Sequence, residues 1–152
     1  MNKVALVTGG VRRLGRQIAI YLASLGYDLA IIYNSSSAAE LKKTSAILSA
    51  FGINCRFYKC DLKDAKKIKT TIDKAGKDFK KFDVLVNNSG VIKKVDLQSI
   101  TPELFDNTIA VNLRAPLFVT QASLKYLKKA KEPVVINIAS LGGMQNWSGY
   151  IP

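Results

Sequence analysis

The alternation of short apolar segments with helix-forming segments restricts the fold of this chain more than any other feature of its sequence. Five segments are rich in β-branched and other apolar residues and are expected to be strands: residues 3–8, 28–33, 55–60, 83–87 and 133–138. They lack the polar and apolar alternation of a half-exposed strand. Such continuous apolar strands are typical of a parallel sheet that helices cover on both faces.

The segments between these strands repeat apolar residues at the three- and four-residue steps of an amphipathic helix. The repeating residues are Leu14, Ile18, Leu22 and Leu25 in the first segment, Leu41, Thr44 and Leu48 in the second, and Ala65, Ile68, Ile72, Ala75 and Phe79 in the third. Residues 61–64 supply acidic or capping side chains where the third helix starts. A fourth helical segment has Thr101 as N-cap and Pro102 in its first turn, and continues through Leu127.

This order of elements predicts an α/β fold of three layers, a Rossmann-type doubly wound parallel sheet. Strands that alternate with helices are joined by right-handed crossovers, and the expected strand order is 3-2-1-4-5. Ligands of such sheets bind beyond the carboxyl ends of the strands, where the winding reverses. The sequence shows neither internal repeats nor a linker, so we expect residues 1–152 to form one domain.

The net charge of +12 raises the question of a nucleic-acid partner. The lysines are spread along the chain as pairs rather than clustered, and they accompany no known nucleic-acid motif and no interleaved aromatic residues. A solvated, lysine-rich surface explains this distribution better than a polyanion site does. We therefore expect no nucleic-acid partner, and a polyanion-binding protein ranks last among the hypotheses.

Localisation and metal chemistry are also constrained by composition. The first residues lack the features of a signal peptide, and no apolar run approaches the roughly 20 residues needed to cross a bilayer, so we expect a cytoplasmic protein without a membrane partner. The chain has no histidine and only two cysteines, Cys55 and Cys60, so no zinc-finger spacing or imidazole site can form. We expect both thiols to be reduced and partly buried, and no metal site.

A glycine-containing loop joins the first strand to the first helix. Residues 8–15 read Thr-Gly-Gly-Val-Arg-Arg-Leu-Gly, and a strand, a tight turn and a helix start present backbone N–H groups to a pyrophosphate. Gly9 permits the turn and Gly15 allows close packing at the helix start. The alternative is an ordinary turn that uses glycine only for its backbone freedom.

This loop resembles that of the short-chain dehydrogenase/reductase family, whose pattern is Thr-Gly-x-x-x-Gly-x-Gly. Thr8, Gly9 and Gly15 match it, whereas Arg13 stands at the middle glycine. Arg-Leu-Gly, with Leu14, is similar to the pteridine reductases and some 3-oxoacyl-acyl-carrier-protein reductases, and the resemblance implies NADP(H). An oxidoreductase is therefore expected.

The end of the second strand favours the same cofactor. An NAD site normally has an Asp or Glu there for the ribose 2′-hydroxyl, but this strand ends in Tyr33, Asn34 and Ser35. Arg12 or Arg13 can pair with a 2′-phosphate, and the neutral side chains can add hydrogen bonds. The alternative is that both arginines are merely exposed loop residues.

Further motifs agree with the resemblance by position. Asp61 and Leu62 resemble the pair that borders the adenine ring, although Asp before a helix is also a common cap. The fourth strand ends in Asn-Asn-Ser-Gly, similar to the family's Asn-Asn-Ala-Gly turn beside the cofactor ribose. The residues of this turn are Asn87, Asn88, Ser89 and Gly90.

Two residues are candidates for catalysis. Asn112 lies in an apolar helical stretch, where asparagine has poor propensity, and the resemblance implies that it bends the helix and supports a proton relay. Ser140 follows the fifth strand, where the family places the serine that hydrogen-bonds the substrate carbonyl oxygen. Without histidine, a Ser-His-Asp hydrolase is excluded.

In the family a Tyr-x-x-x-Lys motif follows the serine, and its tyrosine would fall immediately after Pro152. Tyr150 comes three residues too early, so we interpret it as a substrate-loop or packing residue. We expect the chain to cover about the first three-fifths of the family domain, truncated at the carboxyl end and inactive alone. Pteridine reductases commonly carry aspartate in place of Ser140, so the serine argues against a pterin substrate.

The complete protein is expected to be an NADP(H)-dependent reductase that transfers hydride between nicotinamide and a carbonyl or alcohol, and to form a homo-oligomer. Residues 91–96 and 142–150 are expected to border the substrate, with Met144, Trp147 and Tyr150 making that pocket partly apolar. The alternative is a non-catalytic NADP(H)-binding module, or a homologue that has lost its chemistry.

Overall fold

The computed structural model describes residues 2–143, 145 and 149. The strands are β1 (Val4–Thr8), β2 (Asp28–Tyr33), β3 (Cys55–Lys59), β4 (Val84–Asn87) and β5 (Val134–Asn137). The helices are α1 (Arg13–Ser24), α2 (Ala38–Ser49), α3 (Ala65–Phe79), α4 (Pro102–Ile109) and α5 (Ala115–Leu127), with the π-helical segment η2 (Ala110–Arg114) and the 3-10 turns η1 (Leu97–Ser99) and η3 (Leu141–Gly143). All five expected strands are present, each within one residue of its expected ends.

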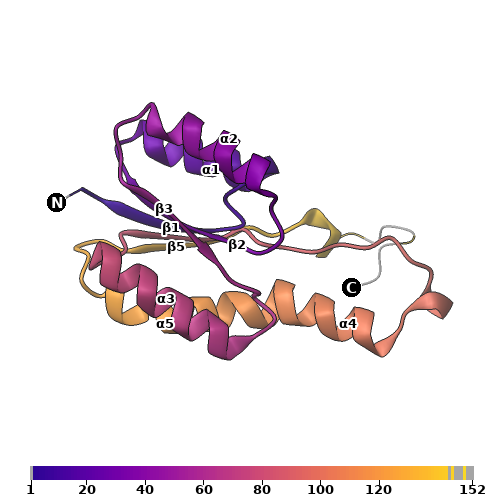
Figure 1. Ribbon diagram of the computed structural model, residues 1–152. Helices are drawn as coiled ribbons and strands as arrows, with labels where there is room; N and C mark the ends of the chain where they lie inside the picture. The colour runs from indigo at the N-terminus through magenta and orange to yellow at the C-terminus, as the bar shows by residue number, and fades with distance from the viewer. Residues whose placement is uncertain (1, 144, 146–148, 150–152) are drawn as a thin grey trace.

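The five strands form one parallel sheet in the order β3-β2-β1-β4-β5. This confirms the expected fold class and strand order. Helices α1 and α2 cover one face, and α3 and α5 cover the other (Figure 1). Since β1 has β2 on one side and β4 on the other, the winding reverses there, at the carboxyl ends of the central strands.

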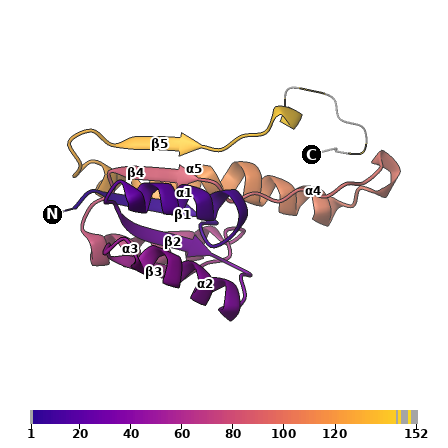
Figure 2. The same ribbon diagram turned by 90° about the horizontal axis from the view of Figure 1, so that it is seen from above.

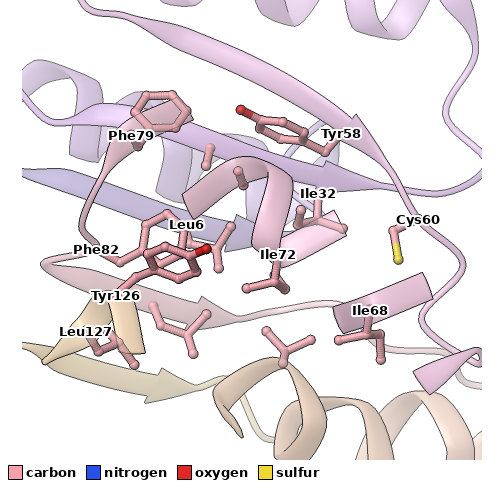
Figure 3. Packing of buried hydrophobic residues seen from close by; sticks show 14 of the residues in the cluster. Leu6, Ile32, Tyr58, Cys60, Ile68, Ile72, Phe79, Phe82, Tyr126 and Leu127 are labelled. Atoms are coloured by element: carbon pink, nitrogen blue, oxygen red, sulfur yellow. The ribbon is translucent and has the colours of Figure 1, made fainter. Parts of the chain in front are cut away.

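The two faces of the sheet belong to separate hydrophobic clusters. Leu6 and Ile32 face α3 and α5, in the cluster that Figure 3 shows from close by, whereas Val7 and Ile31 face α1 and α2. Successive strand residues point to opposite faces, so a strand buried on both sides needs apolar residues at every position. This explains why β1 shows no polar alternation.

The third helix follows the sequence expectation closely. Asp64 caps α3 by accepting hydrogen bonds from the N–H groups of Lys66 and Lys67. Ile68, Ile72, Ala75 and Phe79 are buried against the sheet and α5. Thr101 likewise caps α4, with Pro102 in the first turn, as expected.

The expected apolar face of α1 is wrong at its two ends. Leu14 and Leu25 are 55% and 56% exposed, and the fully buried residues are Gly15, Ala19 and Ala23. The helix packs small side chains most closely against the sheet, and Ile18 and Leu22 lie beside them, only partly buried. The sequence prediction relied on the spacing of large apolar residues. It therefore placed the buried face of α1 one residue before the face that the structure buries.

The two cysteines are free among the described residues, as expected. Cys60 is buried and Cys55 partly so. Burial raises the pKa of the Cys55 thiol to about 12, and burial likewise raises the pKa of the Cys60 thiol. Both side chains therefore act as small apolar residues at neutral pH.

The strand β5 lies at the margin of the sheet (Figure 2). Its apolar side chains Val134, Val135 and Ile136 remain 39–48% exposed, although the strand pairs with β4 in register along its length. An exposed apolar strand at a sheet edge favours association with other chains.

Candidate functional site

A cavity of about 370 Å³ opens at the carboxyl ends of the strands, around the start of α1. It lies where the winding of the sheet reverses, as expected for this fold. The cavity is lined by Gly9, Arg12, Arg13, Leu14, Gly15, Ile32, Tyr33, Asn34, Ser35, Ser36, Cys60, Asp61, Leu62, Asn88, Ser89, Gly90, Val91, Val111 and Ile138. The structure thus brings together every expected cofactor residue except Asn87.

The loop between β1 and α1 is tightly constrained. Gly9 has a φ of +69°, a conformation that favours glycine. A Cβ atom at Gly15 would collide with the carbonyl oxygen of Gly9 and the side-chain amide of Asn88. The expected roles of the two glycines, a turn and close packing, therefore have a steric basis.

The start of α1 differs from that of the other helices. Ser37, Asp64 and Thr101 cap α2, α3 and α4 with their side chains. At α1, the described residues provide no side-chain cap and no acidic residue in the first turn. The first N–H groups of α1 and the positive end of its dipole therefore suit an anionic ligand.

Hydrogen bonds connect this loop to the turn after β4. The Thr8 hydroxyl accepts from the backbone N–H groups of Asn88 and Ser89, at 3.0 Å each. The Asn88 side chain donates to the Thr8 carbonyl oxygen at 2.9 Å. The two loops that line the cavity are thereby held at a fixed distance.

Asn87 has a different position from its neighbours in the turn. It is buried, and its amide donates to the Asn137 side chain at 2.8 Å and to the Thr120 hydroxyl at 3.2 Å. These bonds tie β4 to β5 and α5. Asn87 is therefore outside the cavity lining, and its side-chain amide is bonded to β5 and α5 instead.

The arginines lie at the rim of the cavity. Arg13 occupies the position of the family's middle glycine and adopts a φ of +50°, which is uncommon for a residue with a side chain. Arg12 forms an ion pair of 3.8 Å with Glu40 of α2. The N–H of Ser37 lowers the pKa of the Glu40 carboxyl, and Arg12 and Arg16 lower it further.

Residues at the end of β2 and directly after it line the same cavity as these arginines. Tyr33, Asn34, Ser35 and Ser36 line it with hydroxyl and amide groups, and this segment contains no carboxylate. The one carboxylate in the lining, Asp61, follows β3 instead. The rim between β2 and α1 thus has positive charge and neutral hydrogen-bonding groups.

The two expected catalytic residues lie outside the cavity lining. The Asn112 side chain accepts from the Val91 N–H and donates to the Val91 carbonyl oxygen, at 2.8 Å each, and Val91 itself lines the cavity. Asn112 is in the π-helical segment η2, where the long helix changes its hydrogen-bonding register. Ser140 is exposed, and its hydroxyl accepts from the Gly142 N–H at 3.1 Å.

Two further observations concern what else this part of the chain contains. The described residues include no group of His, Cys, Asp or Glu that could hold a metal ion. Among the helices of the described residues, none is long and apolar enough to span a membrane. The expected substrate residues Met144, Trp147 and Tyr150 lie outside the described residues.

Known proteins resemble this chain in both sequence and fold. The family profile described as short chain dehydrogenase matches residues 3–152. This chain belongs to the short-chain dehydrogenase family. The glycine loop, the turn after β4 and Ser140 of this short-chain dehydrogenase all fall within the matched residues.

Three relatives illustrate the similarity. The short-chain dehydrogenase/reductase FrzI of Cladobotryum sp is 32% identical over 97% of this chain and 56% of its own length. The 3-oxoacyl-[acyl-carrier-protein] reductase FabG of Staphylococcus aureus is 31% identical over 94% of this chain and 58% of its own length. A crystal structure of a metagenomic short-chain oxidoreductase in complex with NADP superimposes with a TM-score of 0.88, at 32% identity, over 97% of this chain and 66% of that one.

This short-chain dehydrogenase chain therefore spans 56–58% of the length of these curated relatives, close to the expected three-fifths. The resemblance to oxidoreductases of this family, and to 3-oxoacyl reductases among them, is confirmed.

Several residues of the site were missing from the sequence prediction. Val111 and Ile138 add apolar lining from two separate segments, and only the fold brings them beside Val91, which was expected to border the substrate. Glu40 had a signal in the sequence, because Ser37 and Glu40 have the spacing of a capping box. That spacing does not reveal its contact with Arg12.

Proposed function

We propose that this chain forms the NADP(H) site of an oxidoreductase that transfers hydride between nicotinamide and a carbonyl or alcohol substrate. The observation that carries this proposal is the cavity lining, in which Arg12 and Arg13 occur together with residues 33–36, which include no carboxylate. Guanidinium groups bind phosphate oxygens through paired, charge-assisted hydrogen bonds. A carboxylate at the end of β2 would instead repel a 2′-phosphate.

The residues present fit a dinucleotide. The backbone of residues 9–15 and the uncapped start of α1 would hold the pyrophosphate, and Asp61 and Leu62 would border the adenine. The loops on either side are tied together by Thr8 and Asn88, so the site needs little ordering on binding. When bound, the nicotinamide cofactor supplies or accepts the hydride.

We assign the remaining roles to Ser140 and Asn112. Ser140 would donate a hydrogen bond to the substrate oxygen, which stabilises the charge that develops there. Asn112 would hold the backbone of Val91 at the cavity and support a proton relay. In the whole protein, a tyrosine with a lysine four positions later would supply the proton, and a homo-oligomer is the assembly that we propose.

Nucleotide affinity tests the cofactor assignment directly. Dissociation constants for NADPH and NADH should be measured by calorimetry with the wild-type chain and with Arg12→Gln, Arg13→Gln and Lys131→Gln. Lys131 is exposed before β5 and serves as a control for the loss of one positive charge. Each charge-assisted contact is worth about 1.5–3 kcal/mol, so we expect NADPH to bind at least about tenfold more tightly than NADH.

The variants distinguish the parts of this proposal. Loss of the NADPH preference in either arginine variant, with the preference kept in Lys131→Gln, would support the 2′-phosphate assignment. Equal affinity of the wild type for NADPH and NADH would make NADP(H) the wrong cofactor. Failure of both nucleotides to bind would remove the dinucleotide site itself.

A further inference from the structure

The carboxylate of Glu40 makes two contacts at the edge of the cofactor cavity. Its Oε2 accepts a hydrogen bond of 2.8 Å from the Ser37 N–H, while Oε1 lies 3.8 Å from Nη1 of Arg12. In return, the Ser37 hydroxyl accepts from the Glu40 N–H at 3.2 Å. This reciprocal capping box fixes the carboxylate at the start of α2, beside the arginine.

Glu40 thereby occupies groups that would otherwise attract an anion. Arg12 lines the cavity, and Ser37 directly follows the lining residues Asn34, Ser35 and Ser36. The guanidinium and the N–H at the start of α2 are both typical phosphate-binding groups. The side chains of Arg12 and Glu40 are 50% and 37% exposed, so an arriving ligand can reach the pair.

We propose that Glu40 is a built-in counter-anion that competes with the cofactor's 2′-phosphate for Arg12 and so sets the strength of the NADP(H) preference. The inference rests on the proposed function of this cavity. Because the capping box holds the carboxylate, Glu40 stays near Arg12 when the nucleotide binds. The phosphate must then share the guanidinium with a like charge.

The lowered pKa of Glu40 agrees with this geometry, since the carboxylate remains ionised at neutral pH. The hydrogen bond from the Ser37 N–H is the largest cause of this lowered pKa, and the charges of Arg12 and Arg16 lower it further. The competition should therefore be present throughout the neutral range.

The Glu40→Gln variant removes the negative charge without changing the fold. Glutamine can complete the same capping box, so α2 should start unchanged. Binding of 2′,5′-ADP and of 5′-AMP should be measured by calorimetry in low salt, because these two probes differ by the 2′-phosphate and exposed pairs are screened by salt. Glu132→Gln, at an exposed position before β5, is the matched charge control, and thermal unfolding verifies that each variant is folded.

We expect Glu40→Gln to tighten 2′,5′-ADP binding by about two- to fivefold, the size that corresponds to an exposed ion pair. The affinity for 5′-AMP should change by less than about 1.5-fold, and Glu132→Gln should alter neither probe by more than that. In an Arg12→Gln background, Glu40→Gln should lose its effect, because the contested guanidinium is gone.

Each contrary result has a distinct meaning. Unchanged or weaker 2′,5′-ADP binding in Glu40→Gln, with the wild type still preferring 2′,5′-ADP over 5′-AMP, would overturn the counter-anion and leave the NADP(H) site intact. An undiminished effect in the Arg12→Gln background would also overturn it. A wild type without any preference for 2′,5′-ADP would remove the proposed cofactor and this inference together.

Discussion

Arg13 shows that a departure from a glycine motif has a conformational cost. Its φ of +50° lies in the left-handed region, where a side chain costs about 1–2 kcal/mol. The backbone of the loop therefore keeps the shape that glycine would give it. Strained residues of this kind are typical of functional sites, where the side chain contributes to ligand binding.

Gly76 depends on close packing between α3 and α5. A Cβ atom at this position would overlap the ring of Tyr126, which packs against Phe82 with 5.4 Å between ring centroids (Figure 3). Gly76→Ala should therefore destabilise the protein by about 1–3 kcal/mol in urea unfolding, although alanine is the better helix former. Lys77→Ala, on the exposed side of the same helix, should stay within about 0.5 kcal/mol. A stabilising Gly76→Ala would show that the Tyr126 ring moves freely.

The sequence predicts site residues best where they follow a strand directly. Gly9, Asn34, Asp61 and Asn88 all come within a few residues of a strand end, and parallel strands bring such positions together. Asn87 illustrates the limit, because the side of the strand on which a side chain lies depends on the register at the strand's end. The contact of Glu40 with Arg12 depends on packing between two helices, which residue spacing does not encode.

At the scale of elements, α4 and α5 are predictable as helices from residue spacing, whereas the irregular segment between them is not, and only the family resemblance implied a bend there. The chain changes to a π-helical segment at Ala110–Arg114, where Asn112 bonds the distant backbone of Val91. Such a segment is common at functional sites and depends on a tertiary contact. The close approach of α1 to the sheet is similarly a tertiary effect, which the leucine spacing could not reveal.

Asp73 of α3 forms an ion pair with Lys125 of α5, at 2.8 Å, and a second one within α3 with Lys69, at 3.2 Å. Lys125 first, and Lys69 after it, hold the pKa of Asp73 below its usual range. We expect Asp73→Asn to lower the urea midpoint by about 0.3–0.5 M at low salt. This shift in the urea midpoint should become smaller in 1 M sodium chloride, because salt screens the ion pairs.

Asp106→Asn, on the exposed side of α4, is the control for the loss of one negative charge. It should leave the midpoint nearly unchanged. If Asp73→Asn were equally destabilising at both salt concentrations, the ion pairs with Lys69 and Lys125 would not be the source of the lost stability.

For the whole molecule, the sequence determines the strand order because few alternatives satisfy the rules of topology. Alternating strands and helices require right-handed crossovers, and the glycine loop after β1 places the reversal of winding there. An open edge at the fifth strand follows from its terminal place in the expected order 3-2-1-4-5. How far its side chains are exposed depends on how much of the sheet the surrounding helices cover. Val134, Val135 and Ile136 are exposed on both faces of β5.

Stability should depend on pH at both extremes. The pKa values of Glu40, Asp64, Asp73 and Asp78 are lowered in the folded protein, chiefly by the N–H groups of Ser37 and Lys67, by Lys125 and by the Tyr58 hydroxyl, respectively. These carboxylates stabilise the folded protein at pH values above their pKa in the unfolded chain, 4.5 for Glu and 3.8 for Asp. This stabilisation is lost as the pH falls through their lower pKa values in the folded protein.

At alkaline pH the sign reverses. Burial raises the pKa of Cys55 from 9.0 to about 12, and burial with the Asp78 hydrogen bond raises that of Tyr58. Stability is then lost as the pH rises above the unfolded values. Urea unfolding between pH 3 and 10 should give a plateau near neutrality with a decline at each end, and a constant free energy below about pH 4.5 would contradict the carboxylate contacts.

The strand order also has a consequence for a chain that emerges from the ribosome one residue at a time. β2 pairs beside β1, β3 pairs beside β2, β4 pairs on the free side of β1, and β5 pairs beside β4. Each new strand thus finds an open edge that is already made, and no strand has to be inserted between two paired ones. The amino-terminal half of the sheet can form its contacts while the rest is still being translated, which suits domains that fold as they are synthesised.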